Sequence, residues 1–467
     1  MTSRFLSNSL AGLAGMALHK VAGIATSVAL ARMLGAEQFG VYAFVGTLVF
    51  LLGFLTDLGM ERVLTRELAA KQSEAAALLS NALALKVVLG LSVAGLGAVL
   101  GKLLALDSVS YRCLLLALGA LPLGFDLLAR AYFQSRLEVA AYYRISLVGS
   151  VSFLALVGLC WWWEASVVGV FVAGLANALG VSALFLLSLR ARVRFGWSLV
   201  PARVRMLLAE GFQVGLLGLL FTITLRIDQV ILYHLRGAEE VGRYAAAVRL
   251  TEALGILPEA VMLSLFPLLA AAHTSDPQRF RRRYRLGFRY LAAAAVPLAL
   301  ICTFAGAELL ELVFGAKYRT AAPAVAWLSW NMLLSFLGAV YLNVYLIQSL
   351  YRLLIGVSTV CTLLNIGLNF LWIPTYGLSG AAAATVVSTL VGFGLWFVFP
   401  FTRGAVADCV REGTRAFVAG AAGGLAALAW PTTSGAVCAA VATGVYLTTL
   451  PLLGGLRWAD VRRVTAR

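Results

Sequence analysis

The sequence predicts an all-α polytopic membrane protein of about fourteen transmembrane helices, arranged as two six-helix repeats followed by two C-terminal helices. Three observations lead to this fold class. Of the 467 residues, 61% are hydrophobic and only 12% are charged, whereas about a quarter of the residues in a soluble domain are charged. Apolar runs long enough to cross a bilayer recur along the whole chain. One short motif also occurs twice, each time between two such runs.

The repeated motif reads GAEQFGVYA at 35–43 and GAEEVGRYA at 237–245, so that six of nine positions are identical. Its first glycine permits the left-handed conformation that ends a helix. Glu37 and Glu239 then fall in the first turn of the next helix, where exposed N–H groups favour an anion. The motif therefore predicts a tight turn between two membrane helices in each copy of an internal duplication.

The first repeat is expected to form an N-terminal lobe at 1–189, followed by a basic linker at 190–210. His19 and Lys20 interrupt the first apolar run, which favours a membrane helix over a cleaved signal peptide. Pro122 falls within a span and favours a kink there. The predicted spans, each of about 20 mostly apolar residues, are 8–33, 40–61, 78–101, 110–133, 143–163 and 166–189.

The second repeat is expected at 211–402, and 403–467 holds two more helices and a tail. Because six helices are an even number, both repeats enter the membrane from the same side. The duplication thus predicts that they are related by an axis along the membrane normal. The predicted spans are 211–235, 241–271, 286–306, 323–348, 353–373 and 379–400, then 413–430 and 435–453.

The formal net charge of +16 arises from 37 Lys and Arg against 21 Asp and Glu. The basic residues concentrate in alternate connecting segments, above all at 279–289. The positive-inside rule then places this segment and both termini in the cytoplasm. Since the basic residues form no single patch, the charge argues against a nucleic-acid partner and is compatible with contact to anionic membrane lipids.

The sequence contains no pattern typical of catalysis, cofactor binding or metal binding. Its three histidines are far apart and lack metal-ligand spacing. Its six cysteines are scattered without a Cys-x-x-Cys pair, as is typical of packing residues. No Walker-type phosphate loop is present, and the outer segments are short for a catalytic domain. We expect a protein that is not an enzyme and that needs no cofactor or metal.

Ionisable residues inside the predicted spans are the candidate functional residues. Each is costly in hydrocarbon and is expected to face a cavity or a partner. The candidate substrate-binding cations are Lys20, Arg226 and Arg249, with Lys86 and Arg130 as weaker candidates. The candidate coupling or gate acids are Asp57, Asp126, Asp228, Glu252 and Glu259.

Some of these residues have plausible structural roles. Asp126 and Arg130 lie four positions apart, so they can form an intrahelical ion pair. Lys86 can extend its ammonium to the membrane interface. Asp57 and Glu259 occupy matched positions in the two repeats, which suggests paired gate groups, although chance placement explains the match as well.

The leading cations have alternatives too. Asp228 or Glu252 can neutralise Arg226 or Arg249 between neighbouring helices. Lys20 has no acidic residue in its own span, which favours a position facing the lumen. A polar stripe is expected on one face of the helix at 241–271, at positions 249, 252, 256 and 259.

Five stretches carry a resemblance to a known family. They are ARMLGAEQFGVY at 31–42, LTDLG at 55–59, REL at 66–68, RIDQ at 226–229 with the second motif copy, and PTYGLSGAA at 374–382. In this order they resemble bacterial polysaccharide-biosynthesis flippases (Wzx-like) over nearly the whole chain. The resemblance implies the MATE-like fold of the multidrug/oligosaccharidyl-lipid/polysaccharide exporter (MOP) superfamily. It also implies movement of an undecaprenyl-diphosphate-linked oligosaccharide from the inner to the outer leaflet of the bacterial cytoplasmic membrane.

The expected partners are the lipid-linked oligosaccharide, membrane lipids and other membrane proteins of polysaccharide assembly. Two alternative functions stay open. A cation-coupled small-molecule or drug antiporter has the same fold, but is expected to offer acids rather than Lys and Arg to a cationic drug. A non-transporting component or enzyme of glycan assembly is the other alternative.

Overall fold

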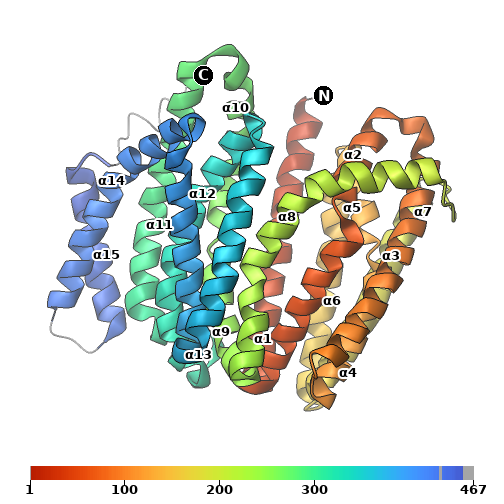
Figure 1. Ribbon diagram of the computed structural model, residues 1–467, viewed down its shortest axis with the longest axis horizontal. Helices are drawn as coiled ribbons and strands as arrows, with labels where there is room; N and C mark the ends of the chain where they lie inside the picture. The colour runs from red at the N-terminus through yellow and green to blue at the C-terminus, as the bar shows by residue number, and fades with distance from the viewer. Residues whose placement is uncertain (1, 431–433, 456–467) are drawn as a thin grey trace. The chain divides into compact units, whose positions relative to one another are not determined.

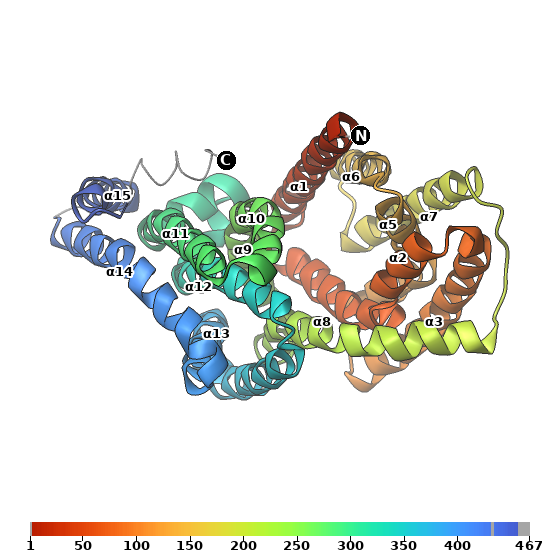
Figure 2. The ribbon, with the colours of Figure 1, turned by 90° about the horizontal axis from the view of Figure 1, so that it is seen from above.

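The computed structural model describes residues 2–430 and 434–455, and within those residues it contains helices but no strands. The chain forms two compact units (Figures 1 and 2). One comprises Met1–Tyr233 with Gly237–Gly242, and the other comprises His234–Arg236 with Arg243–Arg467. The division falls within the second copy of the repeated motif, between Gly242 and Arg243.

The described residues of the first unit form the α-helices α1 to α8 and two 3₁₀ turns. Their bounds are α1 Thr2–Asp57, α2 Met60–Ala70, η1 Gln72–Glu74, α3 Ala75–Leu103, α4 Ser108–Leu118, η2 Leu121–Leu123, α5 Asp126–Ser135, α6 Val139–Trp162, α7 Val167–Arg190 and α8 Pro201–Arg236. Its core includes the fully buried side chains of Leu64, Leu79, Leu128 and Phe133, from α2, α3 and α5. Burial of these apolar side chains stabilises the helix packing that positions the charged residues described below.

The second unit is built from helices α9 to α15. Their bounds are α9 Ala238–Ala253, α10 Ile256–Ser275, α11 Pro277–Phe314, η3 Ala316–Ala321, α12 Ala322–Ile347, α13 Tyr351–Val398, α14 Pro400–Ala429 and α15 Gly435–Leu452. The first residues of α9 belong to the first unit. Asp276 caps α11, because its side chain accepts hydrogen bonds from the backbone N–H groups of Gln278 and Arg279.

Both glycines that open the repeated motif have positive φ, as the sequence predicts. Gly35 has φ 71° and ψ 177°, and Gly237 has φ 88° and ψ 176°. The two copies therefore share one backbone conformation. We expected the ψ of the left-handed helical region. The observed ψ is instead extended, and a positive φ combined with an extended ψ is essentially restricted to glycine. At Gly35 the long helix α1 doubles back on itself (Figure 1).

The two motif copies also touch each other. A Cβ atom built on Gly40 would lie 1.7 Å from the carbonyl oxygen of Ala238, and one built on Gly242 would lie 1.8 Å from that of Ala36. Gly40 and Gly242 are equivalent positions in the repeat, and so are Ala36 and Ala238. The contact is therefore reciprocal, and only glycine allows the backbones to approach so closely.

The helices are long and apolar enough for many membrane crossings. Among the described residues, ten helical segments meet this criterion, or eleven when the bent pair Ala238–Met262 and Ser264–His273 counts as one span. The segments Ala14–Ala70 and Tyr351–Val398 have 57 and 48 residues, which is enough for two crossings each at about 20 residues a crossing. Gly377, with φ 54°, interrupts α13 at the second of these turns.

Two predicted spans are not single helices. The span at 110–133 is divided into α4, η2 and α5, since Pro122 lies in the 3₁₀ turn η2 and cannot continue the hydrogen-bond pattern of α4. The span at 241–271 is divided into α9 and α10 by a turn at Leu254–Gly255. The polar stripe at positions 249, 252, 256 and 259 stays a prediction, since this turn lies inside the helical segment Ala238–Met262 and the bend comes only before Ser264.

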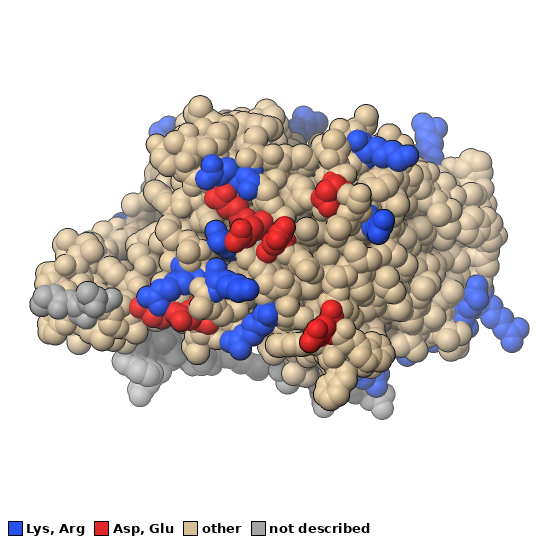
Figure 3. Space-filling view, turned by 90° about the horizontal axis from the view of Figure 1, so that it is seen from below, with Lys and Arg blue, Asp and Glu red and all other residues tan. Residues whose placement is uncertain are grey.

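Seen from below, the surface consists mostly of uncharged residues, with both acidic and basic side chains scattered over it (Figure 3). In Figure 3, basic side chains cover more of this face than acidic ones do. Exposed apolar side chains of the kind expected against lipid are numerous elsewhere in the described chain, and Leu91, Leu187, Leu363 and Leu425 are each more than half exposed.

Candidate functional site: buried and half-buried charges of the helices

Four of the ten predicted site residues lie in one charged network of the first unit. Lys86 of α3 is buried, and its ammonium donates a hydrogen bond to the hydroxyl of Thr56. Asp57 of α1 and Asp126 of α5 both interact with this ammonium electrostatically. Arg130 of α5 lies with its Nη2 3.8 Å from Oδ2 of Asp126, which is the intrahelical pair that the spacing allows.

Glu61 and Tyr142 complete this network, and the sequence analysis did not single them out. The Nε of Arg130 lies 3.7 Å from Oε1 of Glu61, and its Nη2 donates a 2.7 Å hydrogen bond to the hydroxyl of Tyr142. The backbone N–H of Glu61 donates to Oδ1 of Asp57 at 3.1 Å. Glu61 follows Asp57 by four positions, and this spacing was the available signal.

The network contains three carboxylates (Asp57, Glu61 and Asp126) and two cations (Lys86 and Arg130). Both cations therefore have acidic partners within the first unit. An added diphosphate would meet an excess of negative charge here. This arrangement favours a structural or coupling role for Lys86 and Arg130 over direct contact with an anionic substrate.

Arg226 and Asp228 lie on α8, where that helix packs on the second half of α1. The guanidinium carbon of Arg226 is 5.7 Å from the centre of the Phe50 ring, within the range of a cation–π contact. Asp228 is buried, and its Oδ1 accepts a 2.8 Å hydrogen bond from the backbone N–H of Gln229. Thr47 donates a 2.8 Å hydrogen bond to the side chain of Gln229, which fixes the two helices in register.

Lys20 is half-buried on the first half of α1. Its neighbour His19 shares a 2.6 Å hydrogen bond between Nδ1 and the hydroxyl of Ser150 on α6. This bond attaches the first half of α1 to α6 beside the lysine.

In the second unit, Arg249 and Glu252 form an ion pair along α9. The Nη1 of Arg249 lies 3.3 Å from Oε2 of Glu252, and the two side chains are 43% and 35% exposed. A pair this exposed is weak, so Arg249 keeps most of its capacity to bind a stronger anion. Glu259 lies on α10 and is exposed.

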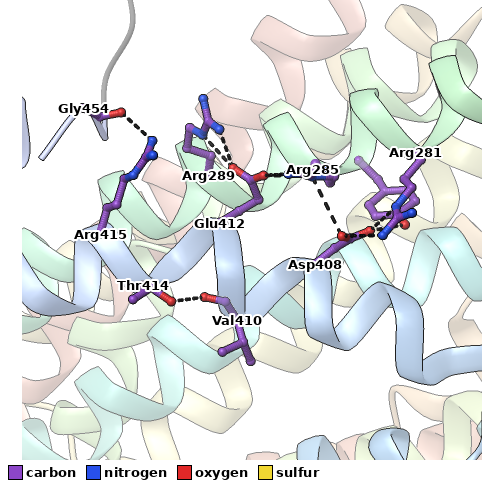
Figure 4. Close-up of polar contacts among 10 residues, drawn as sticks. Arg281, Arg285, Arg289, Asp408, Val410, Glu412, Thr414, Arg415 and Gly454 are labelled. Carbon is purple, nitrogen blue, oxygen red and sulfur yellow. Dashed lines mark hydrogen bonds and ion pairs between the residues drawn. The ribbon is translucent and has the colours of Figure 1, made fainter.

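A second charged cluster, which the sequence analysis missed, joins α11 to α14 (Figure 4). Arg281 binds Asp408 through two hydrogen bonds of 2.7 and 2.9 Å. Arg285 and Arg289 each donate from Nε to Glu412 at 2.8 Å. The arginines recur every four positions on α11 and the acids are four apart on α14, which is the periodic signal that was available.

The two carboxylates of this α11–α14 cluster are only 4% and 5% exposed. Burial alone pushes the pKa of Asp408 upward, but hydrogen bonds from Arg281 and Tyr284 outweigh it, so its pKa lies below the ordinary value. For Glu412, burial acts in the same direction and the hydrogen bonds from Arg285 and Arg289 again lower the pKa overall. Both acids are therefore held in the charged form.

A third missed feature is a buried group of uncharged polar residues within α13. Asn365 and Asn369 are both fully buried. The amide of Asn365 donates to the hydroxyls of Thr385 and Ser388 at 3.5 and 3.3 Å, and Asn369 donates to Asn365 Oδ1 at 3.0 Å. Two asparagines one helical turn apart in an apolar run were the signal for it.

Within residues 2–430 and 434–455, no group of three or more His, Cys, Asp or Glu side chains is arranged to hold a metal ion. The six cysteines in that part of the chain are free, and four of them are buried.

These features define an all-α polytopic membrane protein with the MATE-like (MOP) fold, in which ten or eleven helical segments among the described residues are long and apolar enough to cross a membrane. The family model described as "Polysaccharide biosynthesis protein" matches residues 5–273, more than half of the chain. The chain belongs to this polysaccharide biosynthesis family.

Two curated relatives extend this result. The chain is 23% identical over 407 residues to a putative O-antigen transporter of Shigella flexneri, covering 83% of this chain and 95% of that protein. It is 29% identical over 175 residues to the probable flippase AglR of Haloferax volcanii, and this match covers 36% of each chain.

Two solved structures share the fold. The lipid II flippase MurJ superposes with a TM-score of 0.72 at 12% identity, covering 96% of this chain and 98% of that one. A multidrug resistance MATE family transporter in an inward-facing conformation gives a TM-score of 0.63 at 16% identity, covering 84% and 96%. Identities this low show the fold alone.

Proposed function

We propose that the protein is a flippase that moves an undecaprenyl-diphosphate-linked oligosaccharide from the inner to the outer leaflet of the bacterial cytoplasmic membrane, for export of a cell-surface polysaccharide. Membership of the polysaccharide biosynthesis family is the observation that carries this proposal. The match to a putative O-antigen transporter along 95% of that protein supports it, and so does the likeness in fold to a lipid II flippase.

The mechanism that we propose is alternating access between two six-helix lobes, at 1–189 and 211–402. The C-terminal segment 403–467, which holds α15 and most of α14, lies beside the lipid tail. Lys20, Arg226 and Arg249 bind the substrate's diphosphate, and the polyprenyl chain stays in the lipid. Each of these cations lies on a helix that enters the membrane, where a charge costs about 2.5–3.5 kcal/mol on insertion scales. An anionic substrate offsets this cost, and arginine offers two parallel hydrogen bonds to a phosphate.

The remaining candidate residues fit a coupling role in this mechanism. Asp57 and Asp126 belong to the network that holds one more carboxylate than cations, and such an excess favours uptake of a proton or another small cation. Asp228, Glu252 and Glu259 are the acids on α8, α9 and α10. Changes in their protonation during transport would alter the charge that the substrate meets.

The decisive experiment uses purified protein in liposomes with a fluorescent lipid-linked oligosaccharide in both leaflets. We expect the protein to make the inner-leaflet substrate accessible to a membrane-impermeant reagent, while protein-free liposomes retain about half of the label inside. Recovery of the glycan at unchanged length would separate transport from polymerisation or trimming. Protection equal to that in protein-free liposomes would overturn the proposal.

A second candidate function is a cation-coupled antiporter for small cationic molecules. The observation in its favour is the surplus of carboxylates in the network of the first unit, together with the likeness in fold to a multidrug transporter. The same liposomes distinguish the two functions. A drug antiporter would move a fluorescent organic cation against a pH or Na⁺ gradient and leave the lipid-linked sugar in place.

A further inference from the structure

An open apolar groove lies along the first turns of α8, within the first unit. Its volume is about 680 Å³, and it runs from Pro201 to Phe212 with Leu58 on its other side. Val204, Leu208 and Phe212 recur every four positions, so they line one face of the helix. Phe212 is 53% exposed, and this face therefore presents apolar surface without a covering helix in the first unit.

The groove is preformed because the backbone on both sides is fixed. Leu58 precedes Gly59, and a Cβ atom built on Gly59 would lie 2.3 Å from the carbonyl oxygen of Gly211 on α8. One built on Gly215 would lie 2.8 Å from the carbonyl carbon of Leu58. This close backbone contact holds Leu58 against α8, so a ligand in the groove would touch α8 and the end of α1 together.

One charged residue, Arg205, lines the groove, and it is exposed. Within the described chain it forms no hydrogen bond or ion pair. Its neighbours differ in this respect, since Arg203 pairs with Glu74 at 3.0 Å, and Arg66 of α2 pairs with Glu210 at 2.5 Å. Arg205 is therefore available to an anion from outside the protein.

The groove also lies where a membrane surface is expected. α8 begins at Pro201 and carries Arg203, Arg205 and Glu210 in its first turns, after which the next charged residue is Arg226. The groove thus occupies the amphipathic turns that lead into the crossing. Basic residues at this depth meet the phosphates of anionic lipids, and the apolar face of such turns meets acyl chains.

We propose that this groove binds an anionic glycerophospholipid of the surrounding membrane. One acyl chain packs on Val204, Leu208 and Phe212, and the headgroup phosphate accepts hydrogen bonds from Arg205. The charge of Arg205 and the apolar face complement the two parts of such a lipid. The glycan of a lipid-linked sugar is a poorer fit, since every other lining residue is apolar and leaves sugar hydroxyls without partners.

A bound lipid would bridge Leu58 and α8, and would therefore stabilise the packing of α8 on the end of α1. This role is independent of the transported substrate. The lipid acts as a structural ligand whose binding is linked to stability through its preference for the folded state.

The test measures lipid binding by native mass spectrometry and thermal unfolding of the purified full-length protein, titrated with phosphatidylglycerol or phosphatidylcholine. We expect phosphatidylglycerol to bind more tightly and to raise the unfolding midpoint further. Arg205→Gln should weaken phosphatidylglycerol binding about tenfold, the size expected for one hydrogen bond to a charged group. It should leave phosphatidylcholine binding nearly unchanged.

Arg194→Gln is the matched control. Arg194 lies in the same basic stretch, is exposed, and has no hydrogen-bond or ion-pair partner among the described residues, but it is outside the groove. Equal losses in both variants would mean diffuse attraction to the protein's positive charge and would overturn the proposal. An unchanged preference for phosphatidylglycerol in Arg205→Gln would overturn it too.

Two further arms complete the test. Leu208→Trp fills the groove and should weaken the binding of both lipids at this site. Unchanged binding of both lipids would show that the acyl chain lies elsewhere and would overturn the proposal. Inorganic phosphate at the same concentration should give no stabilisation. A full shift with phosphate alone would identify a free-anion site and overturn the lipid assignment.

Discussion

At the residue scale, the candidate cations fall into two groups with different surroundings. Lys86 and Arg130 share the network of the first unit with three carboxylates. Arg249 has only a weak, exposed pair with Glu252, and Arg226 lies on the face of Phe50. A diphosphate placed beside Lys86 and Arg130 would meet more carboxylates than cations, so the proposed function places Lys20, Arg226 and Arg249 ahead of these two.

The proposed function predicts that Lys20→Ala, Arg226→Ala and Arg249→Ala each reduce transport about tenfold or more, because a lost charge-assisted hydrogen bond to phosphate is worth about 1.5–3 kcal/mol. Arg226→Lys should lose part of the activity, since lysine keeps the charge but not the paired hydrogen bonds. The measurement is export of the glycan in a complementation assay, corrected for the amount of protein in the membrane.

Arg194→Ala serves as the control for losing a surface arginine and should retain activity. Full activity of all three alanine variants would rule out the cationic site. If removing Asp228 or Glu252 together with its arginine restores transport, the arginines are parts of structural ion pairs instead.

At the element scale, glycine decides how the two motif copies meet. The reciprocal contact of Gly40 with Ala238 and of Gly242 with Ala36 leaves no room for a side chain. Farther along α1, Gly46 has nothing within 4 Å of the position that its Cβ would take. The same substitution on one helix is therefore expected to have opposite consequences at the two sites.

We expect Gly40→Ala to destabilise the protein by about 1–3 kcal/mol, as overpacking does, and Gly242→Ala to do the same. Gly46→Ala should be neutral, or stabilising by up to about 1 kcal/mol, because alanine is the better helix former. Thermal unfolding of the purified variants in detergent measures both effects. Equal midpoints for Gly40→Ala and Gly46→Ala would contradict the close contact.

The α11–α14 cluster makes a second prediction at this scale. Removing one carboxylate leaves its arginines without their acidic partner. For a fully buried pair this lowers the free energy of unfolding by about 3–5 kcal/mol. Because Arg281 is 58% exposed, we expect Asp408→Asn to cost less, about 1–3 kcal/mol. Glu412→Gln should cost at least as much, since both Arg285 and Arg289 bind that acid.

These two acids also predict a pH dependence. Their pKa values lie below the ordinary 3.8 and 4.5, so the unfolded state takes up protons first as the pH falls. The stabilisation is complete above the ordinary values and is lost as the pH falls through the lowered pKa values. The double variant Asp408→Asn, Glu412→Gln should show a smaller loss of unfolding midpoint between pH 5 and pH 3 than the natural protein. Parallel curves would contradict this.

At the scale of the whole molecule, the basic residues predict the orientation in the membrane. The positive-inside rule places the segment at 279–289 and both termini in the cytoplasm. A cysteine introduced at Arg283, in a background without the six natural cysteines, should react with a membrane-impermeant reagent only when the reagent is given access to the cytoplasmic side of the membrane. A cysteine at Glu164, between α6 and α7, should react from the outside. The reverse pattern would invert the topology.

The sequence by itself determined the class of fold and the place of its turns. The length of the apolar runs specified membrane helices, because a crossing needs about 20 apolar residues whatever surrounds it. The repeated motif located the positive-φ glycines Gly35 and Gly237, since only glycine adopts that conformation easily. Pro122 marked the break between α4 and α5 for a similarly local reason. All of these properties depend on neighbouring residues in the chain.

Only the tertiary structure decided which charges meet. Arg130 pairs with Glu61, which lies more than sixty positions earlier in the chain. The arginines of α11 pair with Asp408 and Glu412 of α14, which lie more than a hundred positions later. Such outcomes depend on how each helix is rotated and packed against its neighbours, which the composition of a single apolar segment does not specify.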